Sequence, residues 1–241
     1  MNEITKYVVS LANFFKIKLG VTLVEVYKLG SLTHGGFSHI YSDLDVGLLL
    51  NCPNPPEGMA GLISEAKELD STYGRKLSVF WGNPEHEWGR LPVLDRIDLL
   101  DHGVPLLNNH KPIFKRPDTN DIHQALLQSI EKSWKPRVTE LAQLTELEAK
   151  DRKPYVRCLL YPARMIYSWD CLKIDSNDKA VEYLHEVKPS GLDLHPIKLA
   201  LECRYDRYTP EKIISERIDL NKQFETTISY ISNSKYSGVH K

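Results

Sequence analysis

The apolar residues in the first half of the chain gather in short runs separated by polar segments. Such runs span residues 21–29, 45–50 and 77–81, are rich in Val, Leu or aromatic side chains, and are bounded by Gly or charged residues. Short apolar runs of this kind are typical of buried strands. We therefore predict three strands, with residues 104–107 returning as an edge segment.

Helical periodicity separates these runs. Residues 2–18 carry apolar side chains three and four positions apart, which predicts an amphipathic helix leading into the first strand. A second helix is predicted over residues 57–69. A third follows a loop that begins at Gly89 and ends at Gly103, since glycine commonly terminates helices.

Strand patterns stop after a segment rich in Pro, Lys and Arg at residues 108–120. We place a domain boundary there, between a domain of residues 1–115 and a helical domain of residues 116–241. The helical domain is predicted to contain five helices, at residues 122–149, 154–172, 177–185, 196–205 and 210–232. The expected fold class is α+β, with a small mixed-sheet core followed by an all-helical C-terminal domain.

Composition narrows the class of protein. The 241 residues are 41% hydrophobic and carry a formal net charge of −1, so there is no overall basic field to attract nucleic acid. The four cysteines are scattered singly, without zinc spacing, as in a reduced compartment. No run approaches the ~20 apolar residues needed to cross a bilayer. We expect a cytoplasmic protein with neither a membrane nor a nucleic-acid partner.

Candidate chemistry lies where the second strand begins. Asp43 and Asp45 alternate with Leu44, so on a strand both carboxylates point to one side, about 7 Å apart along the chain. Two ionised carboxylates this close repel each other unless a cation lies between them. Mg²⁺ is the expected cation, because it takes oxygen ligands and bridges carboxylates to phosphates.

A phosphate-binding turn precedes the aspartates. Gly30 lets the backbone approach a ligand, and Ser31 offers a hydroxyl and an N–H group to a phosphate. Ser42, directly before Asp43, is placed either to orient a carboxylate or to make a turn into the strand. An EF-hand calcium loop is excluded, because the carboxylates run directly into an apolar segment.

This arrangement resembles the DNA polymerase β-like nucleotidyltransferase superfamily. Its signature is a hydrophobic residue, Gly, Gly or Ser, a spacer and Asp-hydrophobic-Asp, matched here by Leu29, Gly30, Ser31, Asp43, Leu44, Asp45 and Val46. The resemblance implies transfer of a nucleoside monophosphate from a nucleoside triphosphate to a hydroxyl, with ATP as the expected donor. Asp43 and Asp45 would hold Mg²⁺, while Gly30, Ser31 and Ser42 would contact the nucleotide.

A looser resemblance covers the helical domain. It is similar to aminoglycoside adenylyltransferases of the streptomycin/spectinomycin type, through Arg164, Lys173, Ile174, Ser176, Asp178, Ala180, Glu182 and Tyr183. The resemblance implies a small, hydroxylated, cationic acceptor bound by Asp178 and Glu182, and hence antibiotic resistance. Basic residues of this domain are further candidates for phosphate contacts, namely Arg157, Arg164, Lys198 and Arg204.

The sequence departs from the superfamily at the third carboxylate. The next strand offers only Ser78 where an acid is expected, and Glu85, Glu87 and Asp95 follow it in the chain. Glu87 is the candidate general base, and coordination of the acceptor hydroxyl by the metal is an alternative. Two further functions stay open: nucleotidyl transfer to a protein or tRNA, and a nucleotide-binding module without turnover.

Overall fold

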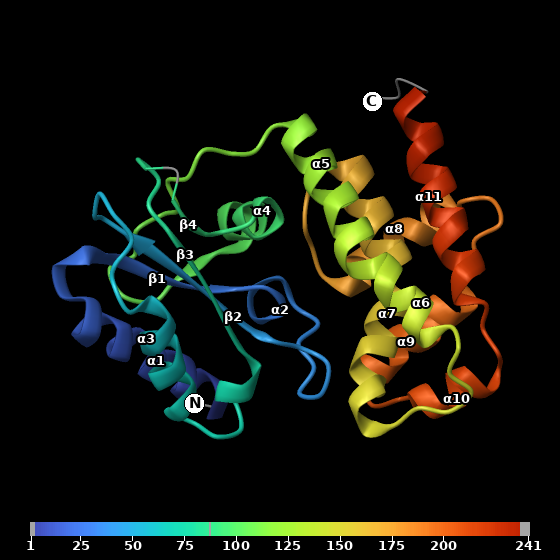
Figure 1. Ribbon diagram of the computed structural model, residues 1–241, viewed down its shortest axis with the longest axis horizontal. Helices are drawn as coiled ribbons and strands as arrows, with labels where there is room; N and C mark the ends of the chain where they lie inside the picture. Colours follow the sequence, from blue (N-terminus) through green and yellow to red (C-terminus); the bar gives the residue numbers. More distant parts are fainter. Residues whose placement is uncertain (1–2, 87, 237–241) are drawn as a thin grey trace. The chain divides into compact units, whose positions relative to one another are not determined.

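The computed structural model describes residues 3–86 and 88–236, and within these the chain forms two compact units. The first contains the described residues up to Gly35 together with Ser42–Pro117. The second contains Gly36–Tyr41 and the described residues from Asp118 onward. Figure 1 shows a sheet flanked by helices in the first unit and only helices in the second.

A five-stranded mixed sheet forms the first unit, in the order β4-β3-β2-β1-β5. The strands are β1 (Leu23–Leu29), β2 (Leu44–Leu50), β3 (Leu77–Gly82), β4 (Gly89–Arg90) and β5 (Val104–Pro105). Strands β2 and β3 run parallel, and the other neighbours are antiparallel. The predicted α+β class is thereby confirmed.

The helices of this unit cover the sheet. They are α1 (Glu3–Leu19), α2 (Ser31–His34), α3 (Met59–Glu68) and α4 (Val93–His102), and two 3₁₀ turns precede β1 and β3, at Gly20–Thr22 and Gly74–Lys76. Helix α1 contacts β1 and α3. Leu99 of α4 joins a buried cluster with Tyr27, Leu29 and Leu49 of the two central antiparallel strands.

A buried carboxylate binds the segment that follows β5. Glu25 of β1 is completely buried and accepts backbone hydrogen bonds from Val26 and from four residues after β5: Leu106, Leu107, Asn108 and His110. Burial raises the pKa of this carboxyl, but the backbone donors outweigh burial and the net pKa is lowered. The charge of Glu25 therefore holds residues 106–110 against β1.

The second unit is organised around one long helix. Helix α7 (Ala149–Cys171) contacts α5 (Thr119–Ser129), α6 (Lys135–Leu141), α8 (Asn177–Val187), α9 (His195–Arg204), α10 (Pro210–Ser215) and α11 (Leu220–Tyr236). A π-helical turn, Ile130–Trp134, joins α5 to α6. No helix in the described part of the chain is long and apolar enough to pass through a membrane.

The helix predicted over residues 122–149 was wrong, because the chain breaks twice within that range. Pro136 has no N–H to donate to the preceding turn, and the helix widens to the π turn just before it. After α6 the chain leaves the helix. It restarts at Ala149, where the Glu148 and Asp151 side chains cap each other's backbone N–H groups.

The single helix predicted over residues 210–232 was also wrong. Helix α10 ends at Ser215, and Arg217 then takes a left-handed conformation with φ of 54°, which no continuous helix accommodates. The Asp219 side chain accepts a hydrogen bond from the Lys222 N–H at 2.9 Å and caps the start of α11. The short helix α2, directly after Gly30, was not predicted.

Candidate active site

Gly30 has a conformation and a neighbour that only glycine allows. Its φ of 62° lies in the left-handed region, and a Cβ built on it would overlap the carboxylate of Asp45. From the sequence, we expect the bare backbone at Gly30 to face a ligand. In the structure the group that packs against it is the Asp45 side chain, so turn and carboxylate form one site.

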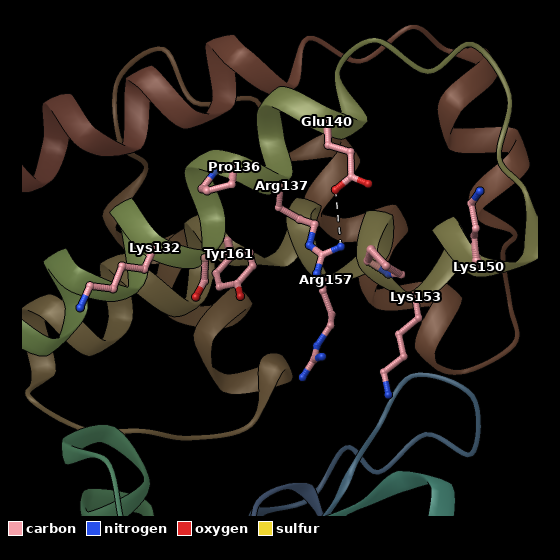
Figure 2. A pocket seen from close by; sticks show the side chains of 10 residues that line it. Lys132, Pro136, Arg137, Glu140, Lys150, Lys153, Arg157 and Tyr161 are labelled. Atoms are coloured by element: carbon pink, nitrogen blue, oxygen red, sulfur yellow. Dashed lines mark ion pairs between the residues drawn. The ribbon is translucent and has the colours of Figure 1, made fainter.

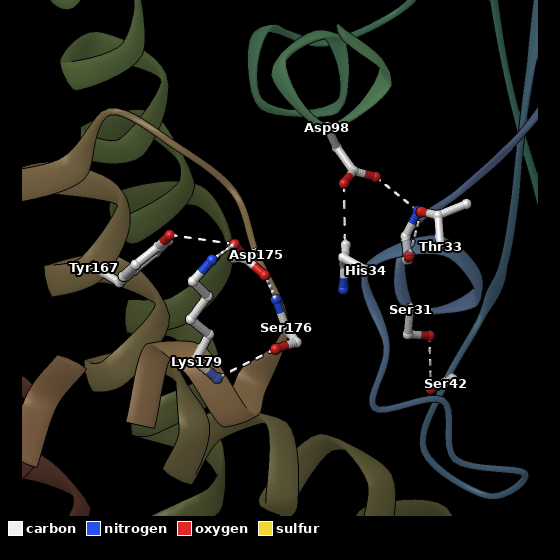
Figure 3. A network of polar contacts seen from close by, with 10 residues as sticks. Ser31, Thr33, His34, Ser42, Asp98, Tyr167, Asp175, Ser176 and Lys179 are labelled. Atoms are coloured by element: carbon white, nitrogen blue, oxygen red, sulfur yellow. Dashed lines mark hydrogen bonds and ion pairs between the residues drawn. The ribbon is translucent and has the colours of Figure 1, made fainter. Parts of the chain in front are cut away.

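The turn after Gly30 is closed by short hydrogen bonds. The Thr33 N–H and the Thr33 hydroxyl donate to the Gly30 carbonyl at 2.9 and 2.8 Å, which shapes helix α2. The Ser31 hydroxyl donates to the Ser42 hydroxyl across 3.0 Å, as Figure 3 shows. Ser31 and Ser42 are eleven positions apart in the chain but are in contact, and both come before the aspartates at the start of β2.

The two aspartates lie at the start of β2. Asp43 directly precedes the strand, which begins at Leu44, and Asp45 is its second residue; both are partly exposed. Asp45 is paired with Leu29 of β1 on one side and with Ser78 of β3 on the other. Serine therefore occupies the register position next to Asp45 in the parallel neighbour. Among the described residues, no group of three or more His, Cys, Asp or Glu residues could hold a metal ion.

Asp98 of α4 is a component that the sequence analysis missed. Its side chain is 10% exposed, and Oδ2 accepts a hydrogen bond from the Gly30 N–H at 2.7 Å. Its Oδ1 lies 3.7 Å from His34 Nε2, and the His34 ring meets His102 edge to face. The Gly30 N–H is thus engaged by the protein, which leaves Ser31 as the nearer donor for a phosphate.

A single sequence signal could have drawn attention to Asp98. It is an acid between Ile97 and Leu99 on the buried face of α4, where an unpaired carboxylate would be costly. Its partner, however, is the N–H of Gly30, 68 residues earlier in the chain, and no local sequence pattern predicts that contact.

The candidate bases are only partly described. Glu87 lies outside the described residues. Glu85 is exposed, and its N–H donates to the Asn83 side chain at 2.7 Å. Asp95 lies in the first turn of α4 and is partly exposed. The identity of the base therefore stays a prediction.

The candidate acceptor residues are on α8 of the helical unit. Ser176 caps this helix by accepting from the Lys179 N–H at 3.2 Å (Figure 3). The Tyr205 hydroxyl lies 2.7 Å from both oxygens of Asp178 and donates to that carboxylate. Burial and this hydrogen bond raise the pKa of Tyr205 to about 12. Glu182, one helical turn later, is exposed.

Arg204 of α9 is a structural anchor within the same unit. It is 7% exposed, and its guanidinium donates to the Gly36 carbonyl at 2.8 Å. Burial, followed by the positive charge of Arg164, lowers its pKa. Arg204 thus holds the segment Gly36–Tyr41, which belongs to the helical unit although it lies between α2 and β2 of the sheet unit in the chain.

Comparison with solved structures places this geometry in a known fold. The chain matches the crystal structure of spectinomycin adenyltransferase AAD(9) from Enterococcus faecialis, solved with ATP and spectinomycin. The TM-score is 0.65 at 16% sequence identity, over 95% of this chain and 98% of the other. The chain has the fold of this adenyltransferase. No protein-family model matches the sequence, and no curated protein does. The resemblance drawn from the sequence is therefore confirmed at the level of fold.

Proposed function

We propose that this protein is a Mg²⁺-dependent nucleotidyltransferase that moves AMP from ATP to a hydroxyl of a small cationic acceptor. The observation that carries the proposal is the packing of the Asp45 carboxylate on Gly30, beside the Ser31–Ser42 hydrogen bond. These contacts join the two halves of the sequence signature in one place. The fold match to an enzyme solved with ATP and spectinomycin supports the donor and the class of acceptor.

The residues present suit a magnesium ion. Mg²⁺ is usually held by one or two carboxylates together with substrate phosphates, and it retains several waters. Asp43 and Asp45 supply two carboxylates at a partly exposed position, so a third protein carboxylate is not required. When bound, the ion would neutralise charge on the triphosphate and stabilise charge developing in the transition state.

The transfer itself is an in-line displacement at the α-phosphorus. The acceptor oxygen forms a bond to that phosphorus, the bond to the bridging oxygen breaks, and pyrophosphate leaves with the electron pair. Ser31 would bind the departing phosphates, and Asp98 would keep the Gly30 turn in place. The acceptor proton passes to a base, for which Glu87 remains the candidate.

Incubation of the full chain with ATP labelled at the α-phosphate tests the proposal. We expect label to appear on spectinomycin or another hydroxylated cationic compound from a panel, with one pyrophosphate released per labelled product. Release that does not depend on any acceptor, or no release with any member of the panel, would contradict transfer to a small molecule. A labelled product on spectinomycin or streptomycin would identify an antibiotic-resistance enzyme.

Binding without turnover is the second candidate function, and Ser78 favours it. A serine beside Asp45 leaves the sheet without the acid that the superfamily resemblance implies. In that case ATP would bind with Mg²⁺ but would be recovered intact after long incubation. Transfer to a protein or tRNA is a separate outcome, in which the label would be recovered in a macromolecule.

A further inference from the structure

Two pockets of the helical unit include residues of α6 and α7, and their linings differ. Figure 2 shows the first, of about 690 Å³, whose lining is rich in lysine and arginine. It contains Arg157, which is already a candidate for phosphate contacts in the proposed reaction. The second pocket, of about 640 Å³, is lined by none of the candidate site residues. A ligand of the second pocket would therefore be independent of the transfer reaction.

Aliphatic side chains form much of the wall of the second pocket. The wall consists of the end of α6 and the segment after it, Tyr155 of α7, the end of α10 and the turn into α11. Leu141, Leu144, Ile214 and Ile218 are among its aliphatic residues. The volume lies within the roughly 300–1,000 Å³ of small-ligand sites. Such a wall suits a ligand with an apolar body, because burial of apolar surface is favourable.

Tyr155 brings a buried hydroxyl to this pocket. The residue is 2% exposed, and its hydroxyl has no hydrogen-bond partner within the described part of the chain. Burial raises the pKa of Tyr155, so the hydroxyl keeps its proton and can donate. Buried tyrosine hydroxyls usually find a hydrogen-bond partner. An acceptor oxygen of a ligand would supply the partner that is missing here.

Arg217 gives the pocket a positive charge. It is the charged residue of a lining that contains no carboxylate among the described residues. Arg217 is exposed and forms no ion pair with another described residue. The adjacent carboxylate, Glu216, instead lies 3.2 Å from His195 Nε2 and accepts from the Tyr208 hydroxyl at 3.2 Å. The charge of the lining therefore favours an anionic ligand.

The backbone of Arg217 has a conformation that arginine rarely adopts. Its φ of 54° lies in the left-handed region, which is unfavourable for a residue with a Cβ. Strain of this kind persists where the surrounding structure imposes it, and it is frequent at ligand sites. Lys188, at the end of α8, is also an exposed cation in the left-handed region, with φ of 48°, but it does not line the pocket. Lys188 is therefore a matched control for Arg217.

We propose that this pocket binds a small carboxylate with an apolar body, such as a medium-chain fatty acid. The carboxylate would pair with the Arg217 guanidinium, which can donate two parallel hydrogen bonds, and would accept a further one from the Tyr155 hydroxyl. The hydrocarbon would pack against the aliphatic wall. This ligand combines one negative charge with apolar surface, as the lining combines one cation with aliphatic side chains.

Calorimetry of the full chain with octanoate tests the proposal. Octanol and octylamine have the same hydrocarbon body and serve as the neutral and cationic comparisons. We expect saturable binding of octanoate with a Kd of about 1 mM or below, and binding of octanol at least about tenfold weaker. Octylamine should not bind, because its charge has the same sign as that of Arg217. Octanoate binding should weaken as salt rises, since the pair with an exposed arginine is screened.

Three variants separate the parts of the pocket. Arg217→Gly removes the cation and suits the left-handed backbone, so it should fold at least as stably as wild type, and it should raise the Kd for octanoate at least about fivefold. Lys188→Gly makes the same kind of change outside the pocket and should alter that Kd less than about twofold. Tyr155→Phe keeps the ring and should raise the Kd about threefold or more through loss of one hydrogen bond.

Several results would overturn the proposal. Octanoate binding that does not saturate would do so, as would octanol binding as tight as that of octanoate. Wild-type affinity in Arg217→Gly, or an equal loss of affinity in Lys188→Gly, would show that Arg217 does not recognise the carboxylate. A peptide ending in leucine that binds while octanoate does not would assign the pocket to a protein partner instead. Asp45→Asn should leave octanoate binding unchanged, which separates failure of this pocket from failure of the proposed transfer site.

Discussion

At the scale of single residues, Asp45 carries the proposed chemistry. Asp45→Asn keeps the size of the side chain and its packing against Gly30 but removes the charge needed to bind a cation. We expect turnover to be lost and Mg²⁺·ATP binding to weaken, with stability unchanged or raised by up to about 1 kcal/mol through relief of repulsion with Asp43. Pyrophosphate release and thermal unfolding measure the two effects.

A matched control for that experiment is Asp193→Asn, an exposed aspartate of the helical unit. It should retain full pyrophosphate release. Asp43→Asn should behave as Asp45→Asn does. Wild-type rates in either variant at the site would show that the metal assignment is mistaken.

Substitutions of Asp98 test its hydrogen bond to the Gly30 turn through the free energy of unfolding, without an activity assay. Asp98→Asn retains an oxygen that can accept from the Gly30 N–H, whereas Asp98→Ala leaves that N–H without its partner. Loss of a hydrogen-bond partner from a buried donor costs about 1–3 kcal/mol. We therefore expect urea denaturation to show a larger loss for Ala than for Asn. Equal losses would indicate that the contact with His34, and not the hydrogen bond to Gly30, is what Asp98 contributes.

The residues of the signature could be chosen from the sequence because they are close together in the chain and their spacing is regular. Leu29, Gly30, Ser31 and Asp45 are examples, and the structure brings the last three together with Ser42 in one place. Asp98 could not be chosen in this way. Its role depends on a tertiary contact with a backbone group. The sequence of α4 does not show whether an aspartate on that helix makes such a contact.

At the scale of elements, Glu25 links β1 to the chain after β5 and makes stability depend on pH. Because its folded pKa is lowered from its ordinary value of about 4.5, its contribution is fully present above that value and is lost as pH falls through the folded pKa. Glu25→Gln should destabilise the protein by about 1–3 kcal/mol at pH 7, since one oxygen acceptor is replaced by a donor facing backbone N–H groups. The difference between wild type and variant should shrink toward pH 3.

Urea denaturation of both proteins at pH 7, 5 and 3 measures this dependence. A difference that stays constant over the whole range would mean that the charge of Glu25 contributes nothing and only its shape matters. Glu65→Gln is a suitable control, because Glu65 is an exposed acid paired with Lys18 on the surface and should show a small effect.

Strands β1, β2 and β3 and most helices followed from hydrophobic periodicity. The helix breaks did not, and strand β4 (Gly89–Arg90) lies where a loop was predicted. The apolar repeat continues across residues 142–148 and 216–219, so periodicity alone predicts uninterrupted helices there. Local backbone chemistry makes the breaks: the reciprocal cap at Glu148 and Asp151 starts a new helix, and the left-handed Arg217 follows the end of α10. Arginine does not favour the left-handed conformation, so the break at Arg217 cannot be predicted from the sequence.

At the scale of the whole molecule, the fold class followed from the change from strand to helix patterns near residue 115. The structure divides the chain between Pro117 and Asp118, and it also assigns Gly36–Tyr41 to the helical unit. The assignment of Gly36–Tyr41 to the helical unit could not be predicted from the sequence. It depends on the hydrogen bond from Arg204 to the Gly36 carbonyl, between residues 168 positions apart.

The proposed function assigns the nucleotide to the sheet unit and the acceptor to the helical unit. Asp178→Asn with Glu182→Gln should therefore reduce acceptor affinity more than tenfold, or about 1.4 kcal/mol, while affinity for Mg²⁺·ATP is unchanged. The reason is electrostatic, because a cationic acceptor would relieve the repulsion between two carboxylates one helical turn apart. Calorimetry with spectinomycin and, separately, with Mg²⁺·ATP measures both affinities.

Tyr205 supplies the control that this experiment needs. Tyr205→Phe removes the hydroxyl that donates to Asp178 but leaves both carboxylate charges. If Asp178 acts only by holding Tyr205, the Phe variant and the double variant will lose acceptor affinity equally. If the carboxylates contact the acceptor, Tyr205→Phe will retain most of the affinity, since a carboxylate released from Tyr205 is free to pair with the cation. Unchanged acceptor binding in the double variant would remove the helical unit from acceptor recognition altogether.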